Sequence, residues 1–144
     1  QARRDELTAE VELYARHLAW LRSPVDRKSD NGLTHGQKLE RDEQELALPP
    51  VAARYLIEAL DELGWAMPTG MGQAPLSCTE IEAWQRCTHT RLEPWEFSLI
   101  RSASNAYVIQ SVSDDTDPPY SEQPHMKPVV AGAFKALAER LRKK

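Results

Sequence analysis

With 144 residues, of which 41% are hydrophobic and 28% charged, the chain has the size and composition of a single soluble domain with flexible appendages. Its formal net charge of −4 gives no electrostatic reason to expect a specific nucleic-acid partner. The apolar runs are only a few residues long, far short of the roughly 20 residues that cross a bilayer, and no charged-then-apolar signal stretch is seen. The sequence therefore predicts no association with a membrane.

The first predicted element is an amphipathic helix over residues 5–21, within an N-terminal segment 1–22. Its apolar side chains recur every three or four positions, which places them on one helical face. These residues are Leu7, Val11, Tyr14, Leu18 and Leu21. The Ser23-Pro24 pair ends the helix. So narrow a stripe is typical of a two-helix seam, and it predicts either docking against the body of the protein or self-association with a second copy.

Residues 23–49 read as a polar loop followed by one short helix. The stretch 26–36 is rich in turn-forming residues. A short helix is expected over about 37–46, with Leu39 and Leu46 as its apolar anchors, and Pro49-Pro50 then breaks the chain.

A helical core domain is predicted over residues 50–112. Its first helix spans about 50–63, with Pro50 as the first helical residue and Gly64 as the left-handed terminator. Residues 65–75 contain two glycines and two prolines and cannot continue a helix, so we expect a loop. This loop carries Trp65, Met67 and Met71, which either fold back over the core or await a partner.

Two further helices complete the predicted core domain. Ser77 and Glu80 have the spacing of a capping box, which starts a helix reaching about Cys87 and burying one face that can include Cys78 and Cys87. Pro94 begins the next helix, which reaches about Val112. The predicted core side chains of the whole domain are Tyr55, Leu56, Leu60, Ile81, Trp84, Ile100 and Tyr107.

The last two segments differ in charge. Residues 113–127 are acidic and proline-rich and are expected to form a flexible linker. Residues 128–144 carry five cations and one anion and predict a basic amphipathic helix. The complete prediction is an all-α fold, a small bundle of about four to six short helices with this linker before the C-terminal helix.

The residues that could carry chemistry do not form a recognisable site. Cys78, Cys87 and His89 are the only candidate ligand cluster, and their spacing is not a zinc pattern. On one helix the two thiols would lie roughly 13 Å apart along the axis, which is beyond disulfide reach. The Gly70-Met71-Gly72 stretch lacks the lysine of a phosphate loop. We therefore expect no enzyme activity, no cofactor, no metal and no small-molecule substrate.

Four stretches in order resemble the small tail assembly chaperones, or related tail morphogenesis proteins, of long-tailed bacteriophages and prophages. They are "DNGLTHGQKLE" (30–40), "LPPVAARYLIEALDELG" (48–64), "PLSCTEIEAW" (75–84) and "LEPWEFSLIRSASNAYVIQ" (92–110). The resemblance covers roughly residues 30–119 and consists of packing motifs. It implies a non-enzymatic protein in the cytoplasm of the bacterial host cell that binds a phage tail protein, such as the tape measure or an unpolymerised tube subunit.

Within that resemblance, loop and helix-start side chains are the candidates for a partner surface, because they are the easiest to expose. They are Trp65, Met67, Met71 and Trp95. Two alternatives stay open: a structural virion component such as a neck or tail-completion adaptor, and a small host-directed phage regulator.

Overall fold

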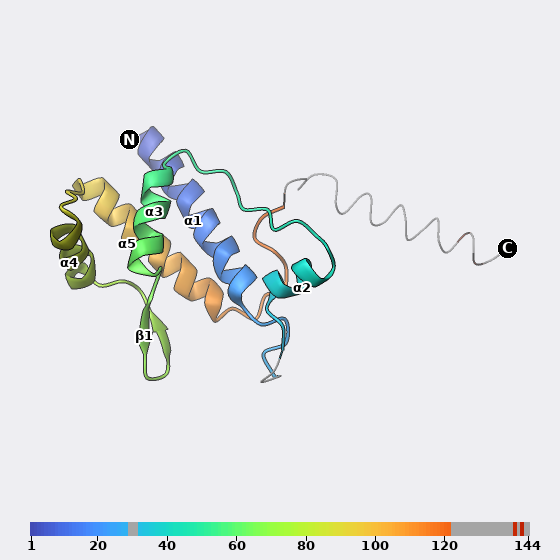
Figure 1. The fold of residues 1–144 in the computed structure, drawn as a ribbon. Helices are drawn as coiled ribbons and strands as arrows, with labels where there is room; N and C mark the ends of the chain where they lie inside the picture. Colours follow the sequence, from blue (N-terminus) through green and yellow to red (C-terminus); the bar gives the residue numbers. More distant parts are fainter. Residues whose placement is uncertain (29–31, 122–139, 141, 143–144) are drawn as a thin grey trace.

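The computed structural model describes residues 1–28, 32–121, 140 and 142. In chain order, the elements are α1 (Ala2–Arg22), α2 (His35–Arg41), α3 (Arg54–Leu63), β1 (Met67–Thr69), β2 (Gly72–Ala74), α4 (Cys78–Thr88) and α5 (Pro94–Ser111) (Figure 1). The described part of the chain is thus mostly helical, and the prediction of a small helical bundle is confirmed at that level. The all-α class is wrong in one respect, because residues 67–74 form an antiparallel hairpin. No helix in the described ranges is long and apolar enough to cross a membrane.

Helix α1 packs along α5, and the two helices run in the same direction (Figure 1). At their starts, the guanidinium carbon of Arg4 lies 5.3 Å from the ring centroid of Trp95. Near their ends, Nη1 of Arg22 donates a hydrogen bond to the hydroxyl of Tyr107 at 3.3 Å. The apolar stripe predicted for α1 is buried or half-buried. Of the two arrangements predicted for that stripe, docking against the body is the one that the structure shows.

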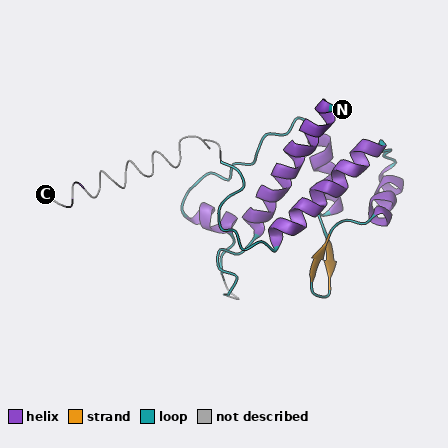
Figure 2. Ribbon diagram, turned by 180° about the vertical axis from the view of Figure 1, so that it is seen from behind, coloured by secondary structure: helices purple, strands orange, loops and turns teal. Residues whose placement is uncertain are grey.

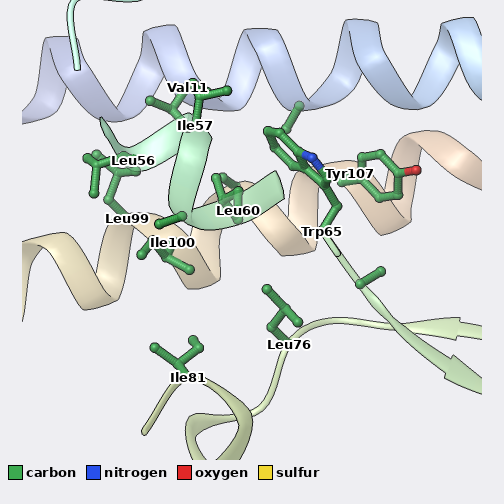
Figure 3. Close-up of a cluster of buried hydrophobic side chains, with 14 of the residues drawn as sticks. Val11, Leu56, Ile57, Leu60, Trp65, Leu76, Ile81, Leu99, Ile100 and Tyr107 are labelled. Atoms are coloured by element: carbon green, nitrogen blue, oxygen red, sulfur yellow. The ribbon is translucent and has the colours of Figure 1, made fainter. Parts of the chain in front are cut away.

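The hydrophobic core lies where α1, α3 and α5 meet, with the start of α4 and the hairpin legs closing one side (Figure 3). Five of the seven predicted core residues are buried, which confirms them: Leu56, Leu60, Ile81, Ile100 and Tyr107. Trp84 is half-buried and packs at the margin of the core. Tyr55 was predicted to be core and is not, because it lies on the outer face of α3 with 49% of its surface exposed.

Trp65 lies at the centre of this core and not on a surface loop. Gly64 and Trp65 both adopt left-handed backbone conformations, with φ of 89° and 67°, which reverse the chain at the end of α3. The predicted role of Gly64 as terminator is confirmed. The reversal places the indole between Tyr14 and Tyr107, at ring-centroid distances of 5.8 and 5.7 Å. Nε1 of Trp65 donates to Asp61 Oδ1 at 2.7 Å, so the buried polar atom is satisfied.

The hairpin replaces the loop predicted for residues 65–75. Its register pairs Met67 with Ala74 and Thr69 with Gly72. Figures 1 and 2 show it projecting beyond the helices. Met71, in the turn between the two strands, is fully exposed. Gly72 has a φ of 134°, a conformation that side-chain-bearing residues rarely adopt, so the glycine permits the tight reversal of the hairpin. The prediction of a loop did not specify this turn.

Two helix boundaries differ from their predictions for local reasons. Helix α3 begins at Arg54 and not at Pro50, because Ala53 has non-helical backbone angles, with φ of −91° and ψ of 66°. Before it, the N–H of Ala52 donates to Glu10 Oε2 of α1 at 3.0 Å. Helix α2 begins in a capping box formed by Thr34 and Gln37 and ends at Arg41, short of residue 46. Glu43 follows with a φ of 55°, which stops further helical winding.

The starts of the last two helices agree with the sequence. Ser77 Oγ accepts a hydrogen bond from the N–H of Glu80 at 3.2 Å and caps α4. Pro94 is the first residue of α5, capped by Glu93 and Glu96. The expectation that the face of α4 takes in Cys78 and Cys87 is wrong, because both thiols are exposed. Only the Ile81 and Trp84 side of α4 turns toward the body.

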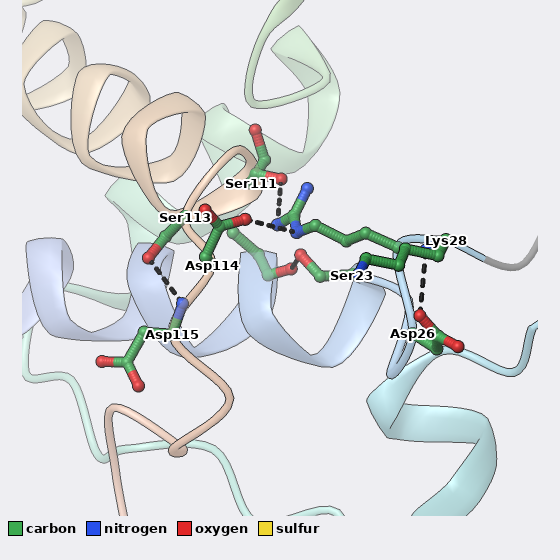
Figure 4. A network of polar contacts seen from close by, with 9 residues as sticks. Ser23, Asp26, Lys28, Ser111, Ser113, Asp114 and Asp115 are labelled. Carbon is green, nitrogen blue, oxygen red and sulfur yellow. Dashed lines mark hydrogen bonds and ion pairs between the residues drawn. The ribbon is translucent and has the colours of Figure 1, made fainter.

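Residues 113–121, which we call the strap, run without regular secondary structure back across the end of α1. Trp20 Nε1 donates to the carbonyl oxygen of Thr116 at 3.1 Å. Arg27 donates to the carbonyl oxygen of Ser111 at 2.7 Å, and its Nε lies 4.0 Å from Asp114 Oδ1 (Figure 4). The first part of the predicted flexible linker is therefore attached to the body. The rest of that linker, and the predicted helix over 128–144 apart from residues 140 and 142, lie outside the described residues.

Candidate partner-binding groove

An open groove lies between α3 and α4, with a volume of ≈ 360 Å³. We call it the α3–α4 groove. Its lining residues are Tyr55, Glu58, Ala59, Glu62, Trp84, Thr88, Thr90 and Leu92. It thus combines aromatic, aliphatic, hydroxyl and carboxylate side chains drawn from two helices and the segment that follows α4.

Helical spacing explains why α3 presents this wall. Tyr55, Glu58 and Glu62 are separated by three and four positions, so they share one face of α3, while Leu56 and Leu60 turn into the core. Across the groove, Nε1 of Trp84 donates to Glu62 Oε2 at 2.7 Å. This bond satisfies the indole N–H and fixes the ring, which leaves its half-buried surface available at the margin of the groove.

The lining of the groove is acidic. Glu58 and Glu62 contribute to its wall, and neither lysine nor arginine is among its lining residues. Arg54 precedes Tyr55, and Arg91 stands between Thr90 and Leu92, but neither lines the groove. Among the described residues, neither arginine forms an ion pair with Glu58 or Glu62. The local field in the groove therefore favours cations.

Tyr55 is further influenced by acids at the start of α5. Burial is the first cause that raises its pKa to about 12, and the neighbouring carboxylates of Glu96 and Glu93 raise it further. The phenol therefore stays protonated and neutral throughout the physiological range. It offers a partner an aromatic face and a hydroxyl group beside an acidic cluster.

The four predicted partner-surface residues are dispersed. Trp65 is in the core, with 1% of its surface exposed, and is not available to a partner in this structure. Met67 is half-buried, and its sulfur accepts a hydrogen bond from the N–H of Ser77 at 3.4 Å. Met71 is exposed at the hairpin tip, as expected for a contact residue. None of the four lines the α3–α4 groove.

Trp95, the fourth of them, is half-buried at a second hollow between the starts of α1 and α5. Its indole N–H donates to Glu93 Oε2 at 2.8 Å. The Arg4 guanidinium stacks over its ring at 5.3 Å and so takes the position that a partner cation would need. This hollow has fewer free aromatic groups to offer than the α3–α4 groove.

The sequence contained a signal for the groove that periodicity alone did not resolve. The helix over 54–63 carries the outward series Tyr55, Glu58 and Glu62, an aromatic residue aligned with two acids. A half-apolar helix can turn an aromatic residue either inward or outward, and periodicity does not decide between the two. The prediction that Tyr55 lies in the core took the inward orientation, and the structure shows the outward one. Trp84 was also assigned to the core, although it supplies the facing wall.

A separate aromatic stack lies beside the strap. The indole of Trp20 stacks on His35 at 4.2 Å and on His17 at 5.5 Å between ring centroids. Tyr120 of the strap meets His17 edge-on at 5.7 Å. Both imidazoles are buried, and Nδ1 of His17 has no hydrogen-bond partner among the described residues. Burial lowers the pKa of both histidines, opposed at His17 by the backbone of Ala47 and reinforced at His35 by Lys38 and Arg27.

The residues first considered for chemistry are not among those that line the groove, although Cys87 and His89 flank the lining residue Thr88 in sequence. Cys78 and Cys87 lie at opposite ends of α4 and are exposed. His89 is exposed and caps α4 with a φ of 51°. Within residues 1–28 and 32–121, no group of three or more histidine, cysteine or acidic side chains is placed to hold a metal ion.

Neither a protein-family model, nor a curated protein, nor a solved structure matches this chain.

Proposed function

We propose that this protein is a non-enzymatic tail assembly chaperone or morphogenesis factor of a long-tailed phage or prophage. In this proposal it binds an unassembled tail component, the tape measure or a tube subunit, through the α3–α4 groove. The four sequence stretches that resemble such proteins support the assignment of the family. Three of them contribute lining residues of the groove, since Tyr55 belongs to the second stretch, Trp84 to the third and Leu92 to the fourth.

The observation that carries the proposal is the exposure of Tyr55 opposite Trp84. Tyr14, Trp65 and Tyr107 stack on one another in the interior, whereas Tyr55 leaves 49% of its surface open. Aromatic side chains in partly desolvated pockets dominate the energetics of protein interfaces. A groove between two helices also suits an amphipathic segment that inserts its apolar side chains. Such a contact would shield the apolar face of a tail subunit until polymerisation buries it.

Co-expression with the tape measure and tail tube proteins of the same genome tests the proposal. We expect a soluble complex that co-elutes in size-exclusion chromatography with light scattering, and a larger soluble fraction of the tail protein. Tyr55→Ala should abolish both effects without altering the circular dichroism spectrum. Ile109→Ala is the matched control, because Ile109 is an exposed apolar residue, 60% accessible, on α5.

The outcome also separates the alternatives. Failure of both tail proteins to bind or to gain solubility would overturn the proposal. Retention of the protein in purified mature particles would favour a neck or tail-completion adaptor, and capture of a host enzyme in place of a tail protein would favour a host-directed regulator.

A further inference from the structure

We propose that the α3–α4 groove selects a partner segment in which an apolar side chain is flanked by lysine or arginine. The inference rests on the proposed function and names the chemistry of the segment that the groove takes. It follows from three features of the groove: its aromatic walls, the two carboxylates of its lining and its size.

The aromatic walls provide the apolar anchor point. Tyr55 and Trp84 face the groove from different helices, and Ala59 and Leu92 add aliphatic surface between them. The small side chain of Ala59 on α3 leaves room where a larger residue would fill the space. An aliphatic or aromatic side chain of the partner would lose water on the sides that face the groove, and burial of apolar surface is the main source of affinity for such contacts.

The carboxylates provide the selectivity. Glu62 uses one oxygen, Oε2, to hold the Trp84 indole, and Glu58 has no hydrogen bond or ion pair to any other described side chain. Glu93 and Glu96 add negative charge on the Tyr55 side, where they help to raise the pKa of the phenol. A bound anionic segment would meet like charges at close range, whereas a cation beside the anchor would be attracted to Glu58 and Glu62 on the α3 wall.

The volume of ≈ 360 Å³ limits what enters. It lies near the small end of the range for ligand pockets, so it fits one or two side chains and not a folded domain. The groove is open along the two helices, and a helical partner segment can therefore lie across it with its cations at the rim.

Fluorescence anisotropy with labelled 16-residue helical peptides tests the inference on the full chain. The first probe peptide has leucine and phenylalanine on one face with lysines beside them. The second replaces the lysines by glutamates, and the third keeps the lysines and replaces the apolar residues by serines. We expect the first peptide to bind, with an affinity that falls as salt is raised, and the second to bind about tenfold more weakly or less. The third should not bind.

The double variant Glu58→Gln/Glu62→Gln keeps the groove shape, since a glutamine oxygen can still accept from the Trp84 indole. It should bind the lysine peptide about tenfold more weakly than the native chain and lose the preference for lysine over glutamate. Glu40 is an exposed acid on α2, and Glu40→Gln is the matched control. It should change neither the affinity for the lysine peptide nor the preference for lysine over glutamate.

Equal binding of the lysine and glutamate peptides, or no binding of either, would overturn the inference. So would concentration-dependent dimerisation abolished by the double variant, which would assign the groove to a second copy of the chain. A different result would overturn the proposed function, namely that the wild-type protein binds no tail protein. A tail complex that survives Glu58→Gln/Glu62→Gln but not Tyr55→Ala would keep the function and reject the cation preference.

Discussion

The hydroxyl of Ser104 on α5 donates a hydrogen bond to the main-chain carbonyl of Trp65 at 2.6 Å. The same oxygen accepts from the N–H of Leu76 at 2.8 Å. One fully buried side chain therefore holds both legs of the hairpin, at the points where the chain leaves the core and returns to it. This explains how a hairpin of three-residue strands is fixed in orientation relative to the helices.

Replacing Ser104 by alanine leaves the Trp65 carbonyl and the Leu76 N–H without these partners in a dry environment. We expect Ser104→Ala to lower the free energy of unfolding by about 2 kcal/mol, because unsatisfied buried polar groups carry the full desolvation penalty. Urea denaturation followed by circular dichroism measures the loss. Ser102→Ala, at an exposed position on the same helix, should change stability by less than about 0.5 kcal/mol. Equal stability of the two variants would contradict the anchoring role.

Trp65 and Met71 were both predicted to contact a partner, but their substitution should have very different effects on the stability of the fold. Trp65→Ala removes the ring between Tyr14 and Tyr107 and should cost about 3–5 kcal/mol of stability. Met71→Ala, at the exposed hairpin tip, should change stability by no more than about 0.5 kcal/mol. Thermal and urea unfolding check both values. A Trp65→Ala protein as stable as the native chain would show that the indole is not part of the core.

The left-handed end of α3 predicts a glycine-specific effect. Gly64 has a φ of 89°, and an added Cβ there would meet nothing nearer than the Ala66 oxygen at 3.9 Å. The cost of Gly64→Ala is therefore backbone strain and not a clash, and we expect about 1 kcal/mol. Gly70→Ala is the control, since a Cβ at that position meets no atom within 4 Å and its φ is not in the left-handed region. Similar losses from both variants would argue against strain as the cause.

Stability should fall as the pH is lowered through the range in which free histidine titrates. Burial lowers the pKa of His17 and His35 in the folded chain. The unfolded chain, with histidine pKa values near 6.5, therefore binds more protons below that pH, and linkage reduces the stability of the fold as protons are added. The stability contributed by the two neutral imidazoles is fully present above about pH 6.5. It is lost as the pH falls through the lowered pKa values of His17 and His35 in the folded chain.

Urea unfolding at a series of pH values between about 7.5 and 5.5 measures that dependence. His17→Phe keeps an aromatic ring beside Trp20 and should flatten the curve, because no imidazole remains there to be protonated. The exposed His89 is the control site, and His89→Gln should leave the slope of the wild-type chain unchanged. A slope that is the same in all three proteins would remove His17 as its cause.

Some features of this protein were readable in the sequence because they are local. The start of α5 at Pro94, the Ser77 cap and the Gly64 terminator each depend on a few neighbouring residues with fixed backbone preferences. The stripe on α1 follows from helical periodicity, which indicates that one face must be covered. These rules predict where helices begin and end and which side of α1 is apolar.

What covers each face was decided by tertiary packing. The stripe on α1 could equally meet a second copy, and only the arrangement of α3 and α5 around it assigns it to the core of its own chain. Tyr55 and Trp65 exchanged their expected places, because the reversal after Gly64 turns one aromatic side chain inward while α3 leaves the other facing α4. The hairpin and the strap depend on Ser104 and Trp20, whose partners lie 39 and 96 residues away in the chain. Such contacts depend on which segments meet in space, and local preference does not encode that.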